Sequence, residues 1–294
     1  MKAQKESFGL LGRREMILRT AGVLTFAGIG RGVITKAIAQ TSTPIVLTPQ
    51  ETQGPYWVDE QLNHSDLATD PTDNSIQVGL PLVLALTVSQ YANGSITPLK
   101  DAYVDLWHCN AYGIYSDESA YNPGGGTGTV VTTGKKFLRG YQVTDAHGSA
   151  RFTSIYPGWY TSRTPHIHAR LRLYSGSTVT ENFTTQFFFD DSITDMVYQM
   201  SPYNARPNRD TLNSTDNVYN GTDCNTSRAV GTETSLRLAA DSSHAVASYN
   251  IVLDLSSPYS CGTAGDPTEG NPNPPGGGPP PGVPPIGGPP PRVA

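Results

Sequence analysis

Seven short apolar segments, separated by turns that contain glycine, proline, asparagine or aspartate, constrain the fold of this chain most strongly. Segments of this length and spacing are typical of β-strands rather than of helices. The chain has 30 Gly and 24 Pro in 294 residues, which disfavours a helix bundle because proline blocks helix interiors and glycine weakens them. The predicted strands span residues 80–88, 102–107, 138–144, 150–156, 167–174, 182–189 and 248–255. Regular short strands with turn signals predict an all-β fold, a β-sandwich.

Three segments between the strands carry signals of their own. Residues 191–200 place apolar side chains at helical spacing and predict one short helix. Residues 145–148 (Asp-Ala-His-Gly) predict a hairpin turn between two strands. Residues 204–233 are polar and predict a surface excursion. The sandwich is therefore expected to have long loops and one short helix.

The first 39 residues are typical of a secretory signal. Basic residues precede a weakly apolar run, and the small-x-small sequence at residues 37–39 offers a cleavage site. The adjacent Arg13 and Arg14 favour the twin-arginine route, so we expect an exported protein, periplasmic or extracellular. The alternative interpretation is an amphipathic N-terminal helix.

The C-terminal end consists of Pro/Gly repeats with almost no apolar side chains to bury. Residues 265–294 are therefore expected to form a disordered tail that acts as a spacer, the alternative being a ligand for aromatic grooves. No linker-like stretch divides the remainder. The expected organisation is a signal peptide over residues 1–39, a single sandwich domain over residues 40–264 and the tail over residues 265–294.

The charge balance excludes two classes of partner. With a net charge of −5 and only 15% charged residues, the chain lacks the dense basic face that nucleic-acid binding requires. Beyond the signal, no stretch is long and apolar enough to span a bilayer. We therefore expect no nucleic-acid partner and no membrane span.

The three cysteines are too few for a small disulfide-built protein. Export would allow Cys224 and Cys261 to form a disulfide; free thiols or a different pairing are the alternatives. Cys109 follows a strand that is expected to be buried, so a packed thiol is a better interpretation than a nucleophile.

The sharpest chemical feature is the sequence His166-Ile167-His168. On a strand, residues i and i+2 point to the same face, so the two imidazoles converge at a distance that suits a metal ion. The alternative interpretation is an ordinary pair of surface histidines.

The segment before this pair strengthens the metal interpretation. Pro157-Gly158 predicts a turn at a strand end, which places Tyr160 in the loop that leads back to the histidine strand. Arg163 lies three residues before His166. A phenol, a guanidinium and two imidazoles thus belong to one strand-loop-strand unit. Taken singly, Tyr156, Trp159 and Tyr160 are each explained by an aromatic packing cluster.

Five stretches together resemble the intradiol ring-cleavage dioxygenases, the family of the protocatechuate 3,4-dioxygenase and catechol 1,2-dioxygenase types. The stretches occur in the family's order over roughly residues 48–190, and they are specific as a set although no single one is. They are Thr-Pro at 48–49 through Gly-Pro-Tyr at 54–56, Asp-Leu-Trp-His-Cys at 105–109 through Tyr-Ser at 115–116, Leu-Arg-Gly-Tyr-Gln-Val-Thr-Asp at 138–145, Phe-Thr-Ser-Ile-Tyr-Pro-Gly-Trp-Tyr at 152–160, and Arg163 through His-Ile-His at 166–168.

The resemblance implies a ferric iron, Fe(3+), as the cofactor. By their places in these motifs, its implied ligands are Tyr115, Tyr160, His166 and His168. Two further implied residues, Arg163 and Gln186, line the substrate pocket in the family. Tyr160 is implied to leave the metal when substrate binds and thus to take part in catalysis. Tyr156 is the alternative to Tyr160, which we prefer because it follows the turn in the family position.

The implied reaction uses O2 to open a catechol-type ring between its two hydroxylated carbons, giving cis,cis-muconate-type products. Hard anionic phenolate donors suit Fe(III) better than the softer ions that thiolates select. The alternatives for the substrate are catechol, protocatechuate, hydroxyquinol and a larger aromatic compound.

Two departures from the family pattern and two rival functions stay open. The spacer between Tyr160 and His166 is shorter than in the well-studied members, and the N-terminal helical segment that catechol 1,2-dioxygenases use to dimerise is missing. One rival is a zinc hydrolase that uses His166, His168 and a third ligand, which leaves the two tyrosines unexplained. The other is a non-catalytic exported β-sandwich that binds carbohydrate or a partner.

Overall fold

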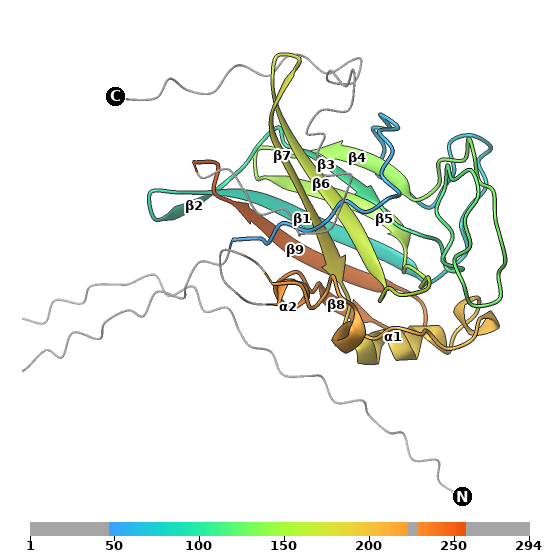
Figure 1. The fold of residues 1–294 in the computed structure, drawn as a ribbon. Helices are drawn as coiled ribbons and strands as arrows, with labels where there is room; N and C mark the ends of the chain where they lie inside the picture. The colour runs from blue at the N-terminus through green and yellow to red at the C-terminus, as the bar shows by residue number, and fades with distance from the viewer. Residues whose placement is uncertain (1–46, 223–228, 257–294) are drawn as a thin grey trace, which may run out of the picture. The chain divides into compact units, whose positions relative to one another are not determined.

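The computed structural model describes residues 47–222 and 229–256, which form a sandwich of two β-sheets (Figure 1). The four-stranded sheet has the order β4-β3-β6-β7, and the five-stranded sheet has the order β2-β1-β9-β8 with β5 also paired to β1. The prediction of an all-β sandwich is confirmed. The proposed signal peptide, the Pro/Gly-rich tail, Cys224 and Cys261 lie outside the described residues and stay predictions.

The five-stranded sheet is built around its longest strand, β1. Its strands are β1 (Pro81–Ala92), β2 (Ser95–Pro98), β5 (Ser149–Ile155), β8 (Arg237–Ala240) and β9 (Ala245–Leu253). On β1, Leu82, Leu84, Leu86 and Val88 alternate with more exposed residues and are buried. This period of two directs one face of the sheet into the core between the layers.

The four-stranded sheet carries the histidine pair. Its strands are β3 (Tyr103–Trp107), β4 (Arg139–Val143), β6 (His166–Ser175) and β7 (Thr178–Phe188). Ile167, Ala169 and Leu171 of β6 belong to the core between the sheets. His166 and His168 alternate with these residues and therefore lie on the outer face of the sandwich.

Helical segments are few and short in the described ranges. They are α1 (Asp191–Tyr198), α2 (Val230–Glu233) and the 3-10 turns η1 (Tyr203–Ala205) and η2 (Asn213–Thr215). The predicted helix is thus confirmed as α1, which begins after Asp190, whose side chain caps it by accepting from the amide of Ser192. No helix in these ranges is long and apolar enough to cross a membrane.

All seven predicted strands are present, with ends that differ by at most four residues. The sequence did not reveal β2 and β8, each of only four residues. The prediction of a hairpin at residues 145–148 is wrong. A tight turn does form there, with the amide of Gly148 donating to the carbonyl of Asp145 at 2.9 Å, but β4 and β5 belong to different sheets. A turn signal fixes the local reversal of the chain and not the partner strand.

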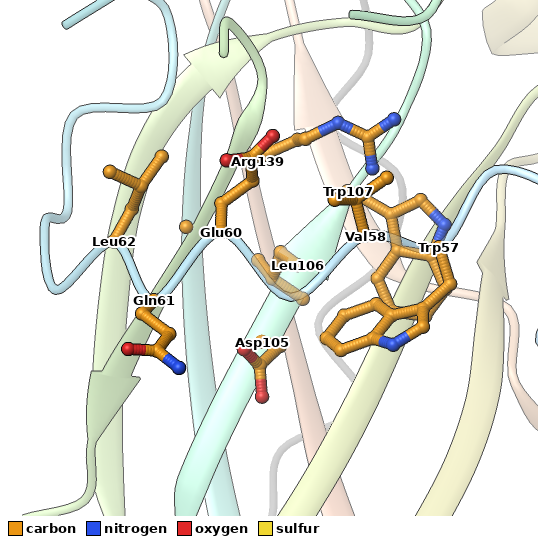
Figure 2. Close-up of a pocket in the computed structure, with 10 residues that line it drawn as sticks. Trp57, Val58, Glu60, Gln61, Leu62, Asp105, Leu106, Trp107 and Arg139 are labelled. Atoms are coloured by element: carbon orange, nitrogen blue, oxygen red, sulfur yellow. The ribbon is translucent and has the colours of Figure 1, made fainter. Parts of the chain in front are cut away.

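The outer face of the four-stranded sheet is covered by residues 57–62, which belong to the chain before β1 and are called the covering segment below. Trp57 packs against Trp107 of β3 with ring centroids 4.7 Å apart, and the guanidinium of Arg170 lies 4.7 Å from the Trp57 ring. Figure 2 shows this segment crossing β3 and enclosing a narrow pocket lined by Glu60, Asp105 and other residues. The outer face is therefore a second buried layer.

Arg172 in this layer is paired with two carboxylates. Arg172 of β6 donates to both carboxylate oxygens of Asp105 on β3, at 3.0 and 2.8 Å, and to Asp59 of the covering segment at 2.8 Å. Bidentate geometry of this kind is the strongest form of the arginine–carboxylate interaction. The triad fixes the covering segment onto the sheet.

His108 joins the two sheets just beyond the end of β3. Its Nδ1 lies 2.9 Å from the carbonyl of Cys109, and its Nε2 lies 2.7 Å from the hydroxyl of Ser154 on β5. The carbonyl can only accept, so Nδ1 carries a proton. Burial lowers the pKa of His108 from 6.5 to about 4.

The lowered pKa of His108 predicts a loss of stability in mild acid. The unfolded chain takes up a proton near pH 6.5 whereas the folded chain resists it down to about pH 4, so stability falls as the pH drops through this window. We expect His108→Gln to remove about 2 kcal/mol of the decrease in unfolding free energy between pH 7 and pH 4.5. Urea unfolding at both pH values measures it, with the exposed His147→Gln as control. An identical pH dependence in wild type and His108→Gln would contradict the prediction.

Candidate active site

The site is built on the first residues of β6, just after the turn at residues 160–163. His166 and His168 are buried, and their Nε2 atoms lie 3.2 Å apart. β6 pairs with β3 on one side and β7 on the other, which places His168 opposite Trp107 and Gln186. The histidine pair is thus held on a strand in the interior of a sheet, where its backbone is fixed on both sides.

The neighbours of each imidazole fix its orientation. His166 Nδ1 lies 2.7 Å from the carbonyl of Thr164, so Nδ1 carries the proton and Nε2 keeps its lone pair. The ring of His168 stacks on Trp107 at 4.7 Å with an interplanar angle of 7°. Gly54, with φ +67°, approaches the other side closely, since a Cβ there would lie 3.2 Å from His168 Cε1.

Tyr160 reaches the pair from a tight turn. The amide of Arg163 donates to the carbonyl of Tyr160 at 3.2 Å, and Ser162 adopts the left-handed φ of 73° that closes the turn. The Tyr160 hydroxyl lies 3.2 Å from His166 Nε2. The short spacer therefore still returns the phenol to the histidines.

Tyr115 comes from the loop that follows β3. Its ring centroid lies 5.7 Å from that of Tyr160 and 6.4 Å from that of His168, and Tyr56 stacks on it at 4.3 Å. Its hydroxyl is buried and makes no hydrogen bond of good geometry within the described parts of the chain, where the phenol of Tyr160 is its polar neighbour. A buried polar atom of this kind is costly unless something binds to it, so it points to a ligand among the four rings.

All four groups are neutral in the protein alone. Burial raises the pKa of the Tyr115 and Tyr160 phenols and lowers the pKa of both imidazoles. The residues in the described ranges contain no group of three or more His, Cys, Asp or Glu that could hold a metal ion. A metal held here would therefore depend on the two tyrosines together with the two histidines.

Arg163 and Gln186 border the same centre. Arg163 Nη1 lies 3.5 Å from the Tyr160 hydroxyl and 3.4 Å from His166 Nε2. Its Nη2 donates to Gln186 Oε1 at 2.7 Å, and Gln186 Nε2 donates to the carbonyl of Thr52 at 2.8 Å. Burial acts to lower the pKa of Arg163, but the Tyr160 oxygen and the Asp216 carboxylate outweigh it, so this pKa is raised. A cation is thus fixed at the edge of the four rings.

Tyr156, the alternative to Tyr160, lies elsewhere. Its hydroxyl lies 2.7 Å from that of Thr194 on α1, and its ring packs on Phe189 with centroids 4.4 Å apart. It belongs to the core between the sheets. The structure therefore brings Tyr160 and not Tyr156 to the histidine pair.

Cys109, just beyond β3, is buried as predicted. Its thiol donates to the carbonyl of Gly158 at 3.4 Å, and burial raises its pKa to about 12. The group is a protonated packing residue, which confirms the prediction that it is not a nucleophile.

The polar segment 204–233 contributes residues to the site that the sequence did not reveal. Asp216 is completely buried and accepts from Arg163 Nε at 2.9 Å and from the amide of Thr164 at 2.7 Å. Arg206 donates to the carbonyl of Trp159 and lies 4.3 Å from its ring. The prediction of a surface excursion is wrong for Asp216, which is buried. No periodicity marks either residue, because the partners of both lie far away in the sequence.

Comparison with known proteins agrees with this geometry. A family model described as Dioxygenase matches residues 52–254, which is more than half of the chain. The intradiol ring-cleavage dioxygenase from Tetranychus urticae is 25% identical, with a TM-score of 0.59 over 74% of this chain and 98% of that one. No curated protein sequence matches the chain.

Two further solved structures are similar at lower scores. The dioxygenase domain of a carbohydrate-binding fusion from Streptomyces sp. SirexAA-E is 23% identical, with a TM-score of 0.47 over 71% of this chain and 99% of that one. Catechol 1,2-dioxygenase from Pseudomonas arvilla C-1 is 24% identical, with a TM-score of 0.44 over 70% and 62%. On the family match, this chain belongs to the intradiol ring-cleavage dioxygenases, a family of oxidoreductases.

Proposed function

We propose that this protein is a ferric-iron dioxygenase that opens catechol-type rings between their two hydroxylated carbons with O2, giving cis,cis-muconate-type products. One observation carries the proposal. The rings of Tyr115, Tyr160, His166 and His168 surround one point, and the buried Tyr115 hydroxyl makes no hydrogen bond of good geometry in the described ranges.

The donor set fits ferric iron. Two phenols and two imidazoles offer hard oxygen and intermediate nitrogen donors, and the thiol of Cys109 is held away by Gly158. When bound, the ion supplies the Lewis acidity that ionises phenolic hydroxyls at neutral pH. Zinc in a hydrolase would use the two histidines but gives the two tyrosines no role. The donors therefore favour the iron proposal.

Tyr115, His166 and His168 are the ligands that stay. Tyr115 is stacked on Tyr56, His168 is stacked on Trp107, and His166 donates to the carbonyl of Thr164. Each of these contacts fixes a ring plane. The three side chains would therefore keep their positions throughout the reaction.

Tyr160 is the ligand that moves a proton. Its oxygen lies 3.2 Å from His166 Nε2 and 3.5 Å from Arg163 Nη1, at the edge of the centre. Tyr160 would be one of the residues that hold the ion, and as a catechol binds, its oxygen would accept a proton from one substrate hydroxyl.

Arg163 supplies positive charge where the ring becomes negative. Its guanidinium lies at the border of the four rings and is held by Gln186 at 2.7 Å. A fixed cation of this kind stabilises a negative charge that develops on the substrate. Burial of the site also excludes water from it.

We further propose that the protein acts outside the cytoplasm. The support is the signal-like sequence of residues 1–39, with its Arg13-Arg14 pair. The substrate would then be an external catechol-type compound.

Loss of a staying ligand should abolish the iron centre. We expect Tyr115→Phe and His168→Ala each to lose the red to purple tyrosinate charge-transfer colour. Ring cleavage should fall by more than about 100-fold, which exceeds the usual effect of mutating a residue that only contacts a metal ligand. Iron analysis, the visible spectrum and O2 uptake with a catechol panel measure this. The half-buried Tyr112→Phe and the exposed His244→Ala are controls. Full iron content and activity in both ligand variants, or a colourless zinc-containing wild type, would overturn the proposal.

Tyr160→Phe should behave differently from the other ligand variants. We expect it to keep iron, to shift and weaken the colour because one of two phenolates is gone, and to slow cleavage by about 100-fold for loss of the proton acceptor. Tyr156→Phe should leave the colour unchanged, since its hydroxyl bonds to Thr194. The reverse pattern of colours in these two variants would reject Tyr160 as a ligand.

A further inference from the structure

We propose that Asp216 is a positioning residue for the reaction: it aims the Arg163 guanidinium at the four-ring centre and so sets the affinity for an anionic aromatic substrate. The inference rests on the proposed function. It concerns a carboxylate that lies 53 residues from Arg163 in the sequence, in a polar segment without any motif.

Both carboxylate oxygens of Asp216 accept hydrogen bonds. It is 0% exposed, and one of its oxygens accepts from Arg163 Nε at 2.9 Å and from the amide of Thr164 at 2.7 Å. The other oxygen accepts from the amides of Val218 and Tyr219 at 2.7 and 3.0 Å. Four donors hold the carboxylate in one orientation, so it is a rigid anchor for the arginine.

The anchor determines where the guanidinium points. Arg163 Nε is bound by Asp216, and Nη2 is bound by Gln186 at 2.7 Å. Because the guanidinium is a planar fork, fixing two of its nitrogens fixes the third. Nη1 is thereby directed at the Tyr160 hydroxyl and His166 Nε2, at 3.5 and 3.4 Å. If Gln186 were its only partner, the guanidinium plane of Arg163 could rotate about that single hydrogen bond.

The charge of Asp216 has a second effect. Arg163 is largely buried, with its side chain 14% exposed, and it borders the proposed cation site. An unpaired buried guanidinium is costly and would move towards water. The carboxylate compensates this charge from the side away from the rings, so Arg163 stays in place whether or not a negatively charged substrate is bound.

Asp216 also supports the turn itself, through Thr164, so a simple loss of activity would not show the positioning role. The discriminating experiment is a double-mutant cycle between Asp216→Asn and Arg163→Met. Asp210→Asn is the matched control, because Asp210 accepts from the amide of Ser162 in the same turn and, within the described ranges, makes no hydrogen bond or ion pair with Arg163. Asp216→Glu keeps the negative charge but moves the carboxylate, because its side chain is longer by one methylene group.

The iron-loaded full chain is titrated with 4-nitrocatechol in the absence of O2, and the Kd is read from the visible spectrum. We expect Asp216→Asn to weaken binding about tenfold or more, the loss typical of a hydrogen bond to a charged group. In the Arg163→Met background, the same change should weaken binding less than about twofold. The KM for substrate should rise more than kcat falls, and Asp210→Asn should match wild type.

The cycle also separates the two proposals. A wild type without iron, colour or ring cleavage rejects the proposed function. A functional wild type in which Asp216→Asn weakens binding equally in both backgrounds rejects the positioning role. If Asp216→Asn does not fold, the cycle is run with Asp216→Glu, for which a Kd between wild type and Arg163→Met is expected. A wild-type Kd in that variant overturns the inference.

Discussion

The side chains of β6 alternate between two buried environments, and this alternation determines where the site can form. One face of this strand adds Ile167, Ala169 and Leu171 to the core, and the other face carries two imidazoles and two guanidinium groups. Polar groups on a face that is covered must find partners there, because unpaired burial is unfavourable. The covering segment meets this demand, since Asp59 pairs with Arg172 and Trp57 packs on Arg170. At the candidate active site, which is the end of this outer layer, the strand residues His166 and His168 face the phenols of Tyr160 and Tyr115 rather than carboxylates.

The short turn between Tyr160 and His166 depends on a distant part of the chain for its shape. A turn this tight places Ser162 in the left-handed region and has little hydrophobic surface of its own to bury. Two residues of the polar segment 204–233, Arg206 and Asp216, hold it from outside. The polar composition of that segment is therefore a requirement of the site, because backbone groups of a tight turn need charged or polar partners.

Local patterns in the sequence predicted the strands, α1 and the convergence of His166 and His168, because each depends on residues close in sequence. The turn signal and the spacing also placed Tyr160 and Arg163 in the same strand-loop-strand unit, whereas Tyr115 and Gln186 followed only from the family motifs. Asp216 was missed, since no periodicity distinguishes a buried carboxylate from its solvated neighbours in an Asn-Ser-Thr-Asp run. The prediction of a hairpin at residues 145–148 was wrong for a related reason. These residues fix a reversal of the chain, whereas pairing along the whole of β4 and β5 decides which sheet each strand joins.

The packing around the four rings supports the proposal that Tyr160 would leave a bound ion while Tyr115, His166 and His168 would stay. Tyr115 is completely buried and His168 nearly so, and each is held face to face by another aromatic ring, Tyr56 and Trp107 respectively. Tyr160 is partly exposed and lies on a turn. Its ring contacts those of Tyr56, Tyr115 and His166 only in T-shaped, edge-to-face arrangements. Rotating it away breaks no stacked contact and no strand pairing. The division of roles among the ligands is therefore consistent with the difference between a sheet-held imidazole, a stacked phenol and a phenol on a turn.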